Sequence, residues 1–179
     1  MKKIALALVA LTAAATPAFA QDDAPTFTGG HVSAVVGYDI LDLNTAGVDN
    51  PDGVAYGVNL GYDLQRGNAV FGIEGEVAES SAELKAGNTV VASAGRDLYV
   101  GGRVGFVAGG NTLVYGKAGY TNARVESSAG DENGDGFRVG GGVETRFGQN
   151  LFGKVEYRYS NYEADVERHQ IVAGLGARF

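Results

Sequence analysis

The stretch VAYGVNLGYDL, which runs from Val54 to Leu64, alternates strictly between two kinds of side chain. Every even position holds a bulky apolar residue, and every odd position holds a small or polar one. Successive side chains of a β-strand point to opposite faces, so this period of two predicts a strand with one apolar face. The stretch therefore predicts a β-strand whose two faces meet different surroundings.

Seven further segments repeat the same alternation, and together with the first they predict eight strands. None of the chain after Gln21 shows the apolar repeat of a helix. The abundance of glycine, 29 residues without a collagen-like period, also disfavours helices. The seven segments are residues 32–40, 71–77, 98–106, 114–120, 137–147, 153–159 and 171–179.

The connections between the eight segments alternate in length. Short Gly- and Asn-containing turns are predicted at residues 65–68, 108–111 and 148–150. Long, polar and mostly acidic loops are predicted at residues 41–53, 80–95, 125–134 and 161–168. Outer-membrane barrels have short periplasmic turns at one end and long external loops at the other. The pattern predicts an all-β fold, an eight-stranded antiparallel transmembrane β-barrel.

The first twenty residues have the features of a cleaved signal peptide. Lys2 and Lys3 precede an apolar run, and Ala18-Phe19-Ala20 forms a small-x-small cleavage site. We expect residues 1–20 to be the signal peptide and residues 21–179 to be a single barrel domain. Cleavage leaves 12 basic and 21 acidic residues, a formal charge of −9, which makes nucleic acid an unsuitable partner.

The composition of the polar face indicates whether the apolar face points into the barrel or outward to lipid. A narrow barrel needs glycines on its inner face to make room for long side chains, and the charged face is rich in glycine. Charges facing lipid would each cost about 2 to 4 kcal/mol for Arg or Lys. We therefore expect a network of paired charges inside the barrel. Its predicted members are Glu74, Glu76, Asp97, Arg103, Lys117, Arg138, Glu144, Arg146, Lys154, Glu156, Arg158 and Arg178, beside Gly57, Gly61, Gly72, Gly101, Gly105, Gly140 and Gly142.

The last twelve residues, RHQIVAGLGARF at 168–179, resemble the final strand of opacity/porin-family outer-membrane proteins, which share the architecture of small OmpA/OmpX-type barrels. Residues 113–120 and 154–160 look like two further strands of that family. The resemblance implies an assembly signal read by the barrel-assembly machinery, formed by Ile171, Ala173, Leu175 and Phe179. Ala177 departs from the family pattern, because an aromatic residue is common there. We expect no peptidoglycan-binding domain of the kind that some relatives carry.

Catalytic and metal-binding motifs are weak. Asp131-Glu132-Asn133-Gly134-Asp135-Gly136 matches the start of a calcium loop, but its twelfth position is Gly142, where a bidentate Glu is required. We interpret it as an acidic hairpin loop. His31 is predicted to face the lumen and His169 to face outward near the outer rim, so they cannot share a site; His169 beside Ser160 is the one pairing left open. With no cysteine, we expect no enzyme activity, no metal and no cofactor.

The sequence predicts an integral protein of the outer membrane that contacts lipid and lipopolysaccharide. Its expected role is non-enzymatic, namely support of outer-membrane integrity and display of surface loops. Two alternatives stay open: an adhesin that recognises a host or matrix ligand through the long loops, and a small-solute porin. No feature of the sequence indicates oligomerisation. Candidates for the interfacial aromatic belts are Tyr38, Tyr56, Tyr62, Phe106, Tyr120, Phe147, Tyr157 and Tyr159.

Overall fold

A computed structural model of the chain describes residues 26–42, 52–81, 83–86, 89–127, 130–162 and 166–179. The predicted signal peptide and cleavage site lie outside the described residues. Nine strands form within the described part: β1 (Gly29–Asp42), β2 (Asp52–Arg66), β3 (Ala69–Ser80), β4 (Glu83–Ala86), β5 (Thr89–Ala108), β6 (Thr112–Ser127), β7 (Gly130–Phe147), β8 (Leu151–Tyr162) and β9 (Val166–Arg178). None of the described residues forms a helix long and apolar enough to cross a membrane.

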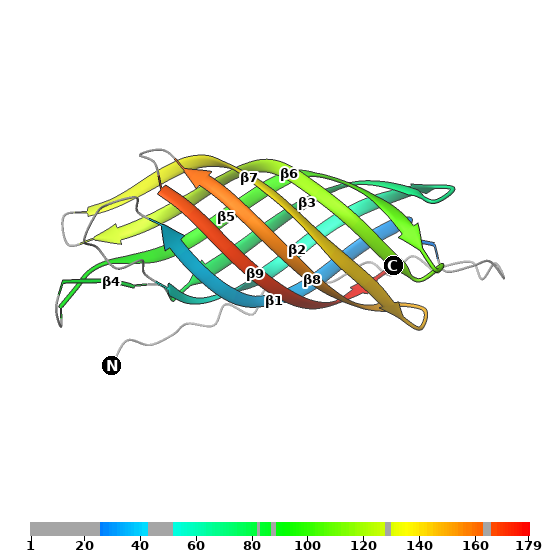
Figure 1. Cartoon of the computed structure of the whole chain (residues 1–179), viewed down its shortest axis with the longest axis horizontal. Helices are drawn as coiled ribbons and strands as arrows, with labels where there is room; N and C mark the ends of the chain where they lie inside the picture. Colours follow the sequence, from blue (N-terminus) through cyan, green and yellow to red (C-terminus); the bar gives the residue numbers. More distant parts are fainter. Residues whose placement is uncertain (1–25, 43–51, 82, 87–88, 128–129, 163–165) are drawn as a thin grey trace.

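Eight of these strands close into an antiparallel barrel, which confirms the predicted fold (Figure 1). Each strand pairs with its neighbours in chain order, with β3 pairing directly with β5, and β1 pairs with β9 to close the sheet. Closure leaves no open sheet edge inside the bilayer, where an unpaired backbone group would cost several kcal/mol.

The strands are strongly staggered around the barrel. A path of paired residues that starts at His31 returns to β1 at Leu41, ten residues further along. The intermediate partners are Gly61, Glu74, Gly101, Gly119, Arg138, Ser160 and Arg168. Eight strands enclose an interior just wide enough for side chains to fill.

The short turns lie where the sequence predicted them. Gly67, Gly109, Gly110 and Gly148 adopt positive φ angles, between 59° and 82°, which L-residues with a side chain rarely adopt. The backbone carbonyls of Asn68, Asn111 and Asn150 accept hydrogen bonds from the backbone N–H groups of Val107 in β5, Arg146 in β7 and Arg178 in β9, respectively. Backbone hydrogen bonds therefore link the turns to the neighbouring strands at this end of the barrel.

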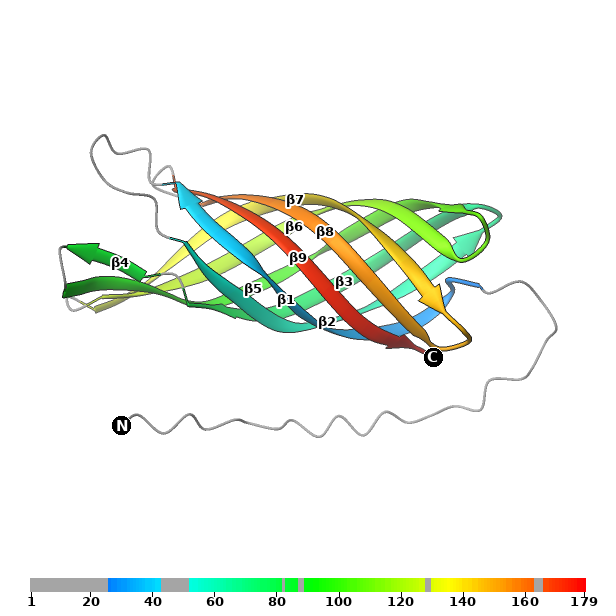
Figure 2. The ribbon, with the colours of Figure 1, turned by 60° about the horizontal axis from the view of Figure 1, so that its bottom comes forward.

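The predicted long loops contain more strand than expected. The predicted loop 80–95 holds β4 and the beginning of β5, and the predicted loop 125–134 is spanned by the ends of β6 and β7. Likewise, β9 begins at Val166, inside the predicted loop 161–168. As a result β4 and the ends of β5, β6 and β7 project from the barrel at the end opposite to the C-terminus (Figures 1 and 2). Residues 43–51 of the remaining predicted loop lie outside the described residues.

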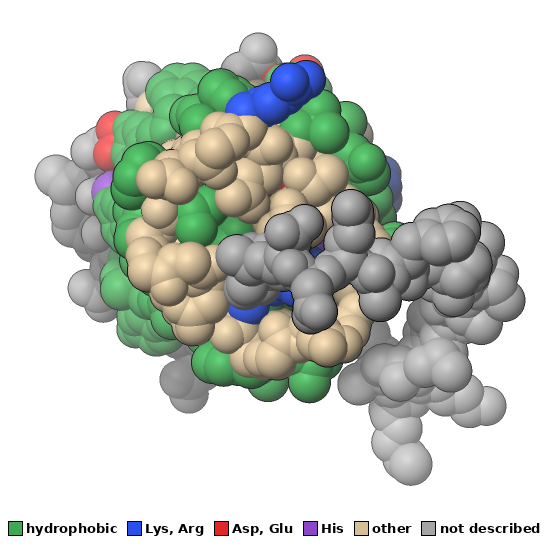
Figure 3. All heavy atoms as spheres, turned by 90° about the vertical axis from the view of Figure 1, so that its right-hand side faces the viewer, with side chains coloured by type: hydrophobic (Ala, Val, Ile, Leu, Met, Phe, Trp, Pro, Cys, Tyr) green, Lys and Arg blue, Asp and Glu red, His purple; other side chains and the backbone are tan. Residues whose placement is uncertain are grey.

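The apolar face of every barrel strand points outward. Ile73, Val100 and Leu175 have exposed fractions of 70%, 61% and 71%, which fits side chains that face lipid rather than water. Viewed from the turn end, hydrophobic side chains surround a ring of backbone and uncharged polar side chains, with basic side chains visible within it (Figure 3). This arrangement is the reverse of a soluble protein and fits a barrel embedded in a bilayer.

The outward aromatic residues form two belts. The belt near the turn end consists of Tyr62, Phe71, Phe106, Phe147 and Phe179, all close to a turn or to the chain end. The opposite belt contains Tyr38, Tyr56, Phe137 and others, which lie in the halves of their strands that are farther from the short turns. The predicted belt residues thus divide between the two membrane interfaces, where amphipathic rings are favoured.

Candidate functional site

The inner face of the barrel carries all twelve predicted charged side chains. Each has an exposed fraction of at most 9%, although it belongs to a strand whose other face is apolar. Because charges persist in such surroundings only when paired and hydrogen-bonded, the contacts among them define the site.

Glycines on the inner face provide the space for these side chains. A Cβ atom on Gly72 would lie 2.0 Å from Oδ1 of Asp63, and one on Gly61 would lie 2.6 Å from the ring of His31. Similarly, a Cβ atom on Gly142 would meet the hydroxyl of Tyr115 at 3.0 Å. A larger residue at Gly72 or Gly61 would displace the polar side chain that lies over it.

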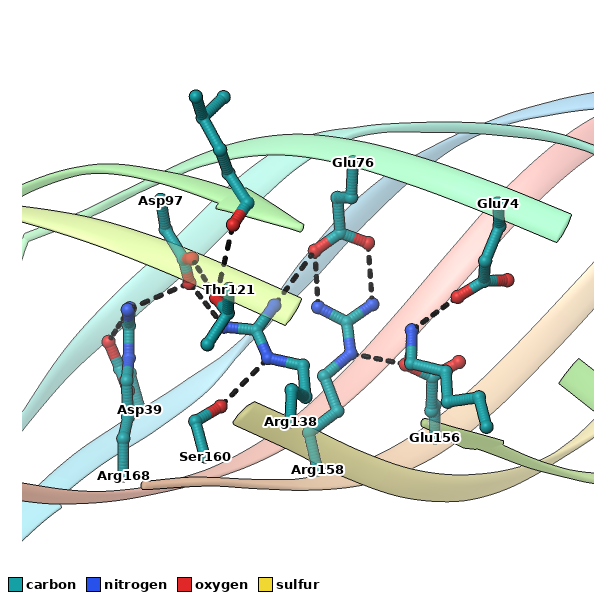
Figure 4. Close-up of polar contacts among 12 residues, drawn as sticks. Asp39, Glu74, Glu76, Asp97, Thr121, Arg138, Glu156, Arg158, Ser160 and Arg168 are labelled. Atoms are coloured by element: carbon teal, nitrogen blue, oxygen red, sulfur yellow. Dashed lines mark hydrogen bonds and ion pairs between the residues drawn. The ribbon is translucent and has the colours of Figure 1, made fainter. Parts of the chain in front are cut away.

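The outer layer of the lumen joins four charged residues from four strands (Figure 4). Arg168 donates from Nε to Oδ1 of Asp39 at 2.7 Å and from Nη1 to Oδ2 of Asp97 at 2.9 Å. Arg138 pairs with the same Asp97 and donates from Nε to Oγ of Ser160 at 2.8 Å. Asp97 is therefore shared by two guanidinium groups, which places a cross-braced cluster at the external end.

The middle layer is built around Arg158 and Lys117. Arg158 pairs with both carboxylate oxygens of Glu76, with Nη2 lying 2.7 Å from Oε2, and its Nε also contacts Glu156. Lys117 lies 2.6 Å from Glu74 and 2.8 Å from Glu156. Glu156 accepts a further hydrogen bond from the hydroxyl of Tyr115 at 2.6 Å. Bidentate Arg–carboxylate pairs are among the strong hydrogen bonds, so this layer is rigidly tied.

The third layer lies near the periplasmic end and is centred on two carboxylates. Asp63 accepts from Arg103, with Nε 2.8 Å from Oδ1, and from Arg178, with Nη2 2.7 Å from Oδ2. Glu144 accepts from the same two arginines, at 3.2 Å from Arg103 and 2.9 Å from Arg178. Longer contacts connect the layers: Arg103 with Glu74 at 3.9 Å and Arg138 with Glu76 at 3.8 Å. The ion pairs thus run without a break along the lumen.

Three members of this network were missing from the predicted set: Asp39, Asp63 and Arg168. The sequence predicts Arg168 at the end of a loop, whereas it lies in β9 on the same face as Gln170 and Arg178. With these three, the buried charges described here comprise seven acids and eight Lys or Arg residues. Strand parity alone was the signal that could have identified them.

Two predicted members are placed differently from the rest. Arg146 lies on the inner face but donates to the backbone carbonyls of Thr26 and Gln149, and no ion pair of Arg146 is present among the described residues. Lys154 approaches a carboxylate oxygen of Glu156 only at 4.0 Å, and its Nζ has no hydrogen-bond partner within the described part of the chain. The network therefore consists of a tightly tied majority and two loosely held cations.

The structure separates the residues considered for catalysis. His31 is buried in the lumen, with Nδ1 3.4 Å from Oδ2 of Asp63. His169 lies on the outer face, where its Nδ1 is 2.8 Å from the hydroxyl of Tyr157. Ser160 points inward to Arg138, so the pairing of Ser160 with His169 is wrong. These residues therefore do not bring a nucleophile into contact with a general base.

The acidic segment 131–136 is not a loop. It lies within β7 and pairs in register with β6, so its interpretation as a hairpin loop is wrong. Asp135 accepts hydrogen bonds from Tyr120 and from Asn122, the latter at 2.6 Å. Within the described residues, no three His, Cys, Asp or Glu side chains gather as a metal site would require.

The residues of the predicted assembly signal lie on the outer face of β9 and at its end. Ile171 and Phe179 have exposed fractions of 61% and 62%, and Ala173 and Leu175 share their face. The main chain of Phe179 exchanges two hydrogen bonds with Gly30, at 2.9 and 3.0 Å. The phenylalanine ring lies over Gly30, where a Cβ atom would meet it at 2.7 Å. The terminal residue thus completes the pairing of β9 with β1.

At the external end, tyrosine hydroxyls reach polar groups on the neighbouring strand. Tyr38 donates to Asp52 at 2.7 Å, and Tyr56 donates to Glu79 at 2.9 Å. Tyr120 makes the corresponding contact with Asp135. The outer aromatic belt is therefore tied from strand to strand at the level where the chain leaves the apolar band.

Comparisons with known proteins agree with this architecture. The family model described as "Outer membrane protein beta-barrel domain" matches residues 6–179. The chain is 28% identical over 160 residues to the 25 kDa outer-membrane immunogenic protein of Brucella ovis, covering 86% of this chain and 79% of that protein. It is also 30% identical over 138 residues to the 22 kDa outer membrane protein of Rhizobium leguminosarum bv. viciae, covering 68% of this chain and 64% of that protein.

Solved structures show the same fold at low sequence identity. Neisserial surface protein A superimposes with a TM-score of 0.60 at 16% identity, covering 85% of this chain and 98% of that one. The attachment invasion locus protein of Yersinia pestis gives a TM-score of 0.54 at 22% identity, covering 84% of this chain and 99% of that one. The chain belongs to the outer-membrane β-barrel family and is an integral protein of the outer membrane.

Proposed function

We propose that the protein is a non-enzymatic barrel that supports the integrity of the outer membrane and displays a projecting sheet on the cell surface. The observation that carries this proposal is the unbroken chain of ion pairs from Asp39 and Arg168 to Asp63 and Arg178. Side chains tied across the lumen favour a rigid, filled barrel over a transport path. Lipid and lipopolysaccharide would contact the apolar band and the outer tyrosine belt.

The porin alternative is disfavoured by the same network. A solute would have to pass the Asp97 cluster, in which two arginines share one carboxylate. Opening that cluster would leave buried charges without partners, which is strongly destabilising. We therefore expect refolded protein in liposomes to give no solute uptake above empty liposomes, after an unheated gel-mobility shift has shown a closed barrel. Uptake would overturn the filled-lumen proposal and favour a pore.

The integrity role is tested in cells that lack the protein. We expect such cells to become more sensitive to detergent and to large antibiotics that an intact outer membrane excludes. Complementation with the unaltered chain should restore resistance. A variant with the network weakened, such as Glu76→Leu, should restore it only in proportion to the folded protein in the membrane. Unchanged sensitivity in the deletion strain would contradict the role.

A second candidate function, recognition of a surface ligand, is favoured by the projecting sheet. Residues Gly130–Asp135 of β7 pair with β6, whereas pairing of β7 with β8 begins at Gly136. Within the described part of the chain no strand pairs with the other edge of β7 above the barrel, and an edge of this kind is a template for another extended chain. The partner would be a host or matrix protein.

Shortening the projection separates the two roles. Replacing residues 123–134 by a two-residue turn removes the ends of β6 and β7 but leaves the part of β7 that pairs with β8. Loss of binding to cells or matrix, with the gel shift and detergent resistance retained, would support recognition. Retained binding would exclude this edge as the ligand site. If the unaltered protein does not bind to cells or matrix, support of outer-membrane integrity would be the remaining function.

A further inference from the structure

The residue that fills the periplasmic mouth of the lumen belongs to none of the strands. Phe27 precedes β1, yet it is fully buried and packs in one cluster with Val70, Val107, Leu113 and Tyr115. These four residues come from β3, β5 and β6, which lie across the barrel from the seam between β1 and β9. Residues 26–28 therefore place the side chain of Phe27 inside the mouth, against the wall opposite the seam between β1 and β9.

Polar contacts fix this segment in the mouth. The backbone N–H of Phe27 donates to Oε1 of Gln65 at 2.7 Å, and its carbonyl accepts from Nη1 of Arg178 at 2.8 Å. The guanidinium of Arg178 lies 5.0 Å from the centre of the Phe27 ring and that of Arg146 lies 5.8 Å away, within the range of cation–π attraction. Thr28 accepts a hydrogen bond from the backbone of Gln65 at 3.0 Å. Gln65, Arg146 and Arg178 of the barrel thus hold the segment in place.

Above this mouth, one wall of the lumen carries polar atoms without a protein partner. Ser33 and Asn59 face each other across β1 and β2, and neither side chain has a hydrogen bond within the described residues. Lys154, whose Nζ has no hydrogen-bond partner among the described residues and approaches Glu156 only at 4.0 Å, lies over Gly174 on the strand next to β1. Buried polar groups are nearly always hydrogen-bonded, to protein or to water. These three side chains therefore mark a part of the lumen that water must reach.

We propose that residues 26–28 form a periplasmic plug, in which Phe27 closes the mouth of a hydrated polar chamber lined by Ser33, Asn59 and Lys154. The chamber is closed at the external end by the Asp39–Arg168–Asp97–Arg138 cluster. The plug is the weaker of the two closures, because a short segment outside the sheet forms it through one apolar cluster and a few hydrogen bonds, whereas ion pairs among four strands form the external cluster. Its displacement would open the chamber toward the periplasm while the barrel stays intact.

The absence of cysteine from the chain allows a direct test of the plug. Single cysteines are introduced at two depths, by Val70→Cys in the Phe27 cluster and by Ser33→Cys in the chamber, each with and without Phe27→Ala. The refolded protein in lipid vesicles is treated with a small, positively charged methanethiosulfonate reagent. With Phe27 present we expect both cysteines to react slowly. With Phe27→Ala we expect both rates to rise about tenfold, the factor that corresponds to 1.4 kcal/mol in the opening equilibrium.

Matched controls separate plug loss from general loosening. A cysteine at Phe71, next to Val70 but facing lipid, should stay unreactive to the charged reagent in both backgrounds. A cysteine at Gln149, in an exposed turn, should react rapidly in both. Phe27→Leu, which keeps a large apolar side chain, should protect both lumen cysteines, and Phe27→Val should give an intermediate rate. This graded series also serves if Phe27→Ala prevents folding.

Three results would overturn the proposal. Fast labelling at both depths with Phe27 in place would show that the segment does not close the mouth. Unchanged rates along the Leu, Val and Ala series would show that Phe27 is not the barrier. Faster labelling at residue 70 alone would show that the Asp63–Arg103–Glu144–Arg178 layer seals the lumen, and that no chamber opens to the periplasm.

Discussion

Arg168 of β9 donates from Nε and Nη2, one edge of its guanidinium group, to both carboxylate oxygens of Asp39 of β1, across the seam that closes the barrel. Both residues are almost fully buried, and the remaining nitrogen of Arg168 reaches Asp97 on the far side of the lumen. The first and last strands are therefore joined by side chains as well as by backbone pairing.

Replacing Arg168 should weaken this seam. Arg168→Leu leaves the carboxylate of Asp39 buried without its guanidinium partner, and breaking a buried pair in this way costs about 3–5 kcal/mol. We expect a lower urea midpoint and a lower temperature for loss of the fast-migrating folded band on gels. Arg66→Leu, at an exposed position beside a turn, is the control and should change stability by less than about 0.5 kcal/mol. Equal midpoints for the two variants would contradict the clamp.

The two kinds of interior arginine should differ in their effect on stability. Arg103 pairs with the carboxylates of Asp63 and Glu144, whereas Arg146 donates to backbone carbonyls near the mouth. Arg103→Leu should therefore destabilise the barrel by several kcal/mol more than Arg146→Leu, since it leaves two buried acids with one partner fewer. Urea unfolding followed by β-sheet circular dichroism measures the difference. A larger loss for Arg146→Leu would mean that the mouth contacts, and not the ion pairs, hold the lumen together.

Adjacent residues should report opposite faces of the wall. The chain contains no tryptophan, so a single introduced tryptophan gives an unambiguous fluorescence signal. Tyr99 points into the lumen with an exposed fraction of 4%, and Val100 points to lipid at 61%. We expect brominated lipid to quench the Val100→Trp variant strongly and the Tyr99→Trp variant weakly. The opposite ranking would place the charged face outside and refute the orientation of the barrel.

The role of the last residue can be separated into assembly and stability. Phe179→Ala removes an exposed ring but keeps the backbone pairing with Gly30. If the ring is the assembly signal that the family resemblance implies, the amount of folded protein in the outer membrane should fall several-fold in cells, while refolding yield in detergent stays nearly unchanged. Ala177→Tyr, which restores the aromatic residue common in the family, should have the opposite effect in cells. A parallel fall in cells and in detergent would point to a structural role instead.

The membrane-embedded part of the fold was predictable because lipid imposes a strict rule on it. Because one face of each strand meets lipid and the other meets the charged lumen, apolar and polar or small residues must alternate. This alternation holds along the whole of β2, for example at Val58 and Asn59. Above the bilayer both faces of a strand meet water, so the ends of β5, β6 and β7 lose the alternation. For this reason the sequence predicts loops there. The segment 131–136 was misinterpreted for this reason, since its Asn-Gly and Asp-Gly pairs suggest turns where pairing with β6 continues.

The site was predictable in composition but not in connectivity. Parity placed Glu76 and Arg158 on the inner face, yet no feature of the sequence pairs two residues that lie 82 positions apart. That pairing follows from the stagger of the strands, which the sequence does not display. Phe27 gave no signal at all, because a single aromatic residue before the first strand has no periodic partner.

With the ten-residue stagger, specific contacts at both ends of the seam between β1 and β9 depend on the correct register. A shift of β9 along β1 by one residue would exchange the lipid face and the lumen face. A shift by two residues would keep the faces, but it would separate Arg168 from Asp39 at the external end and Phe179 from Gly30 at the periplasmic end in the same step. A barrel that closes in the wrong register therefore loses two sets of stabilising contacts, which lie about one bilayer thickness apart.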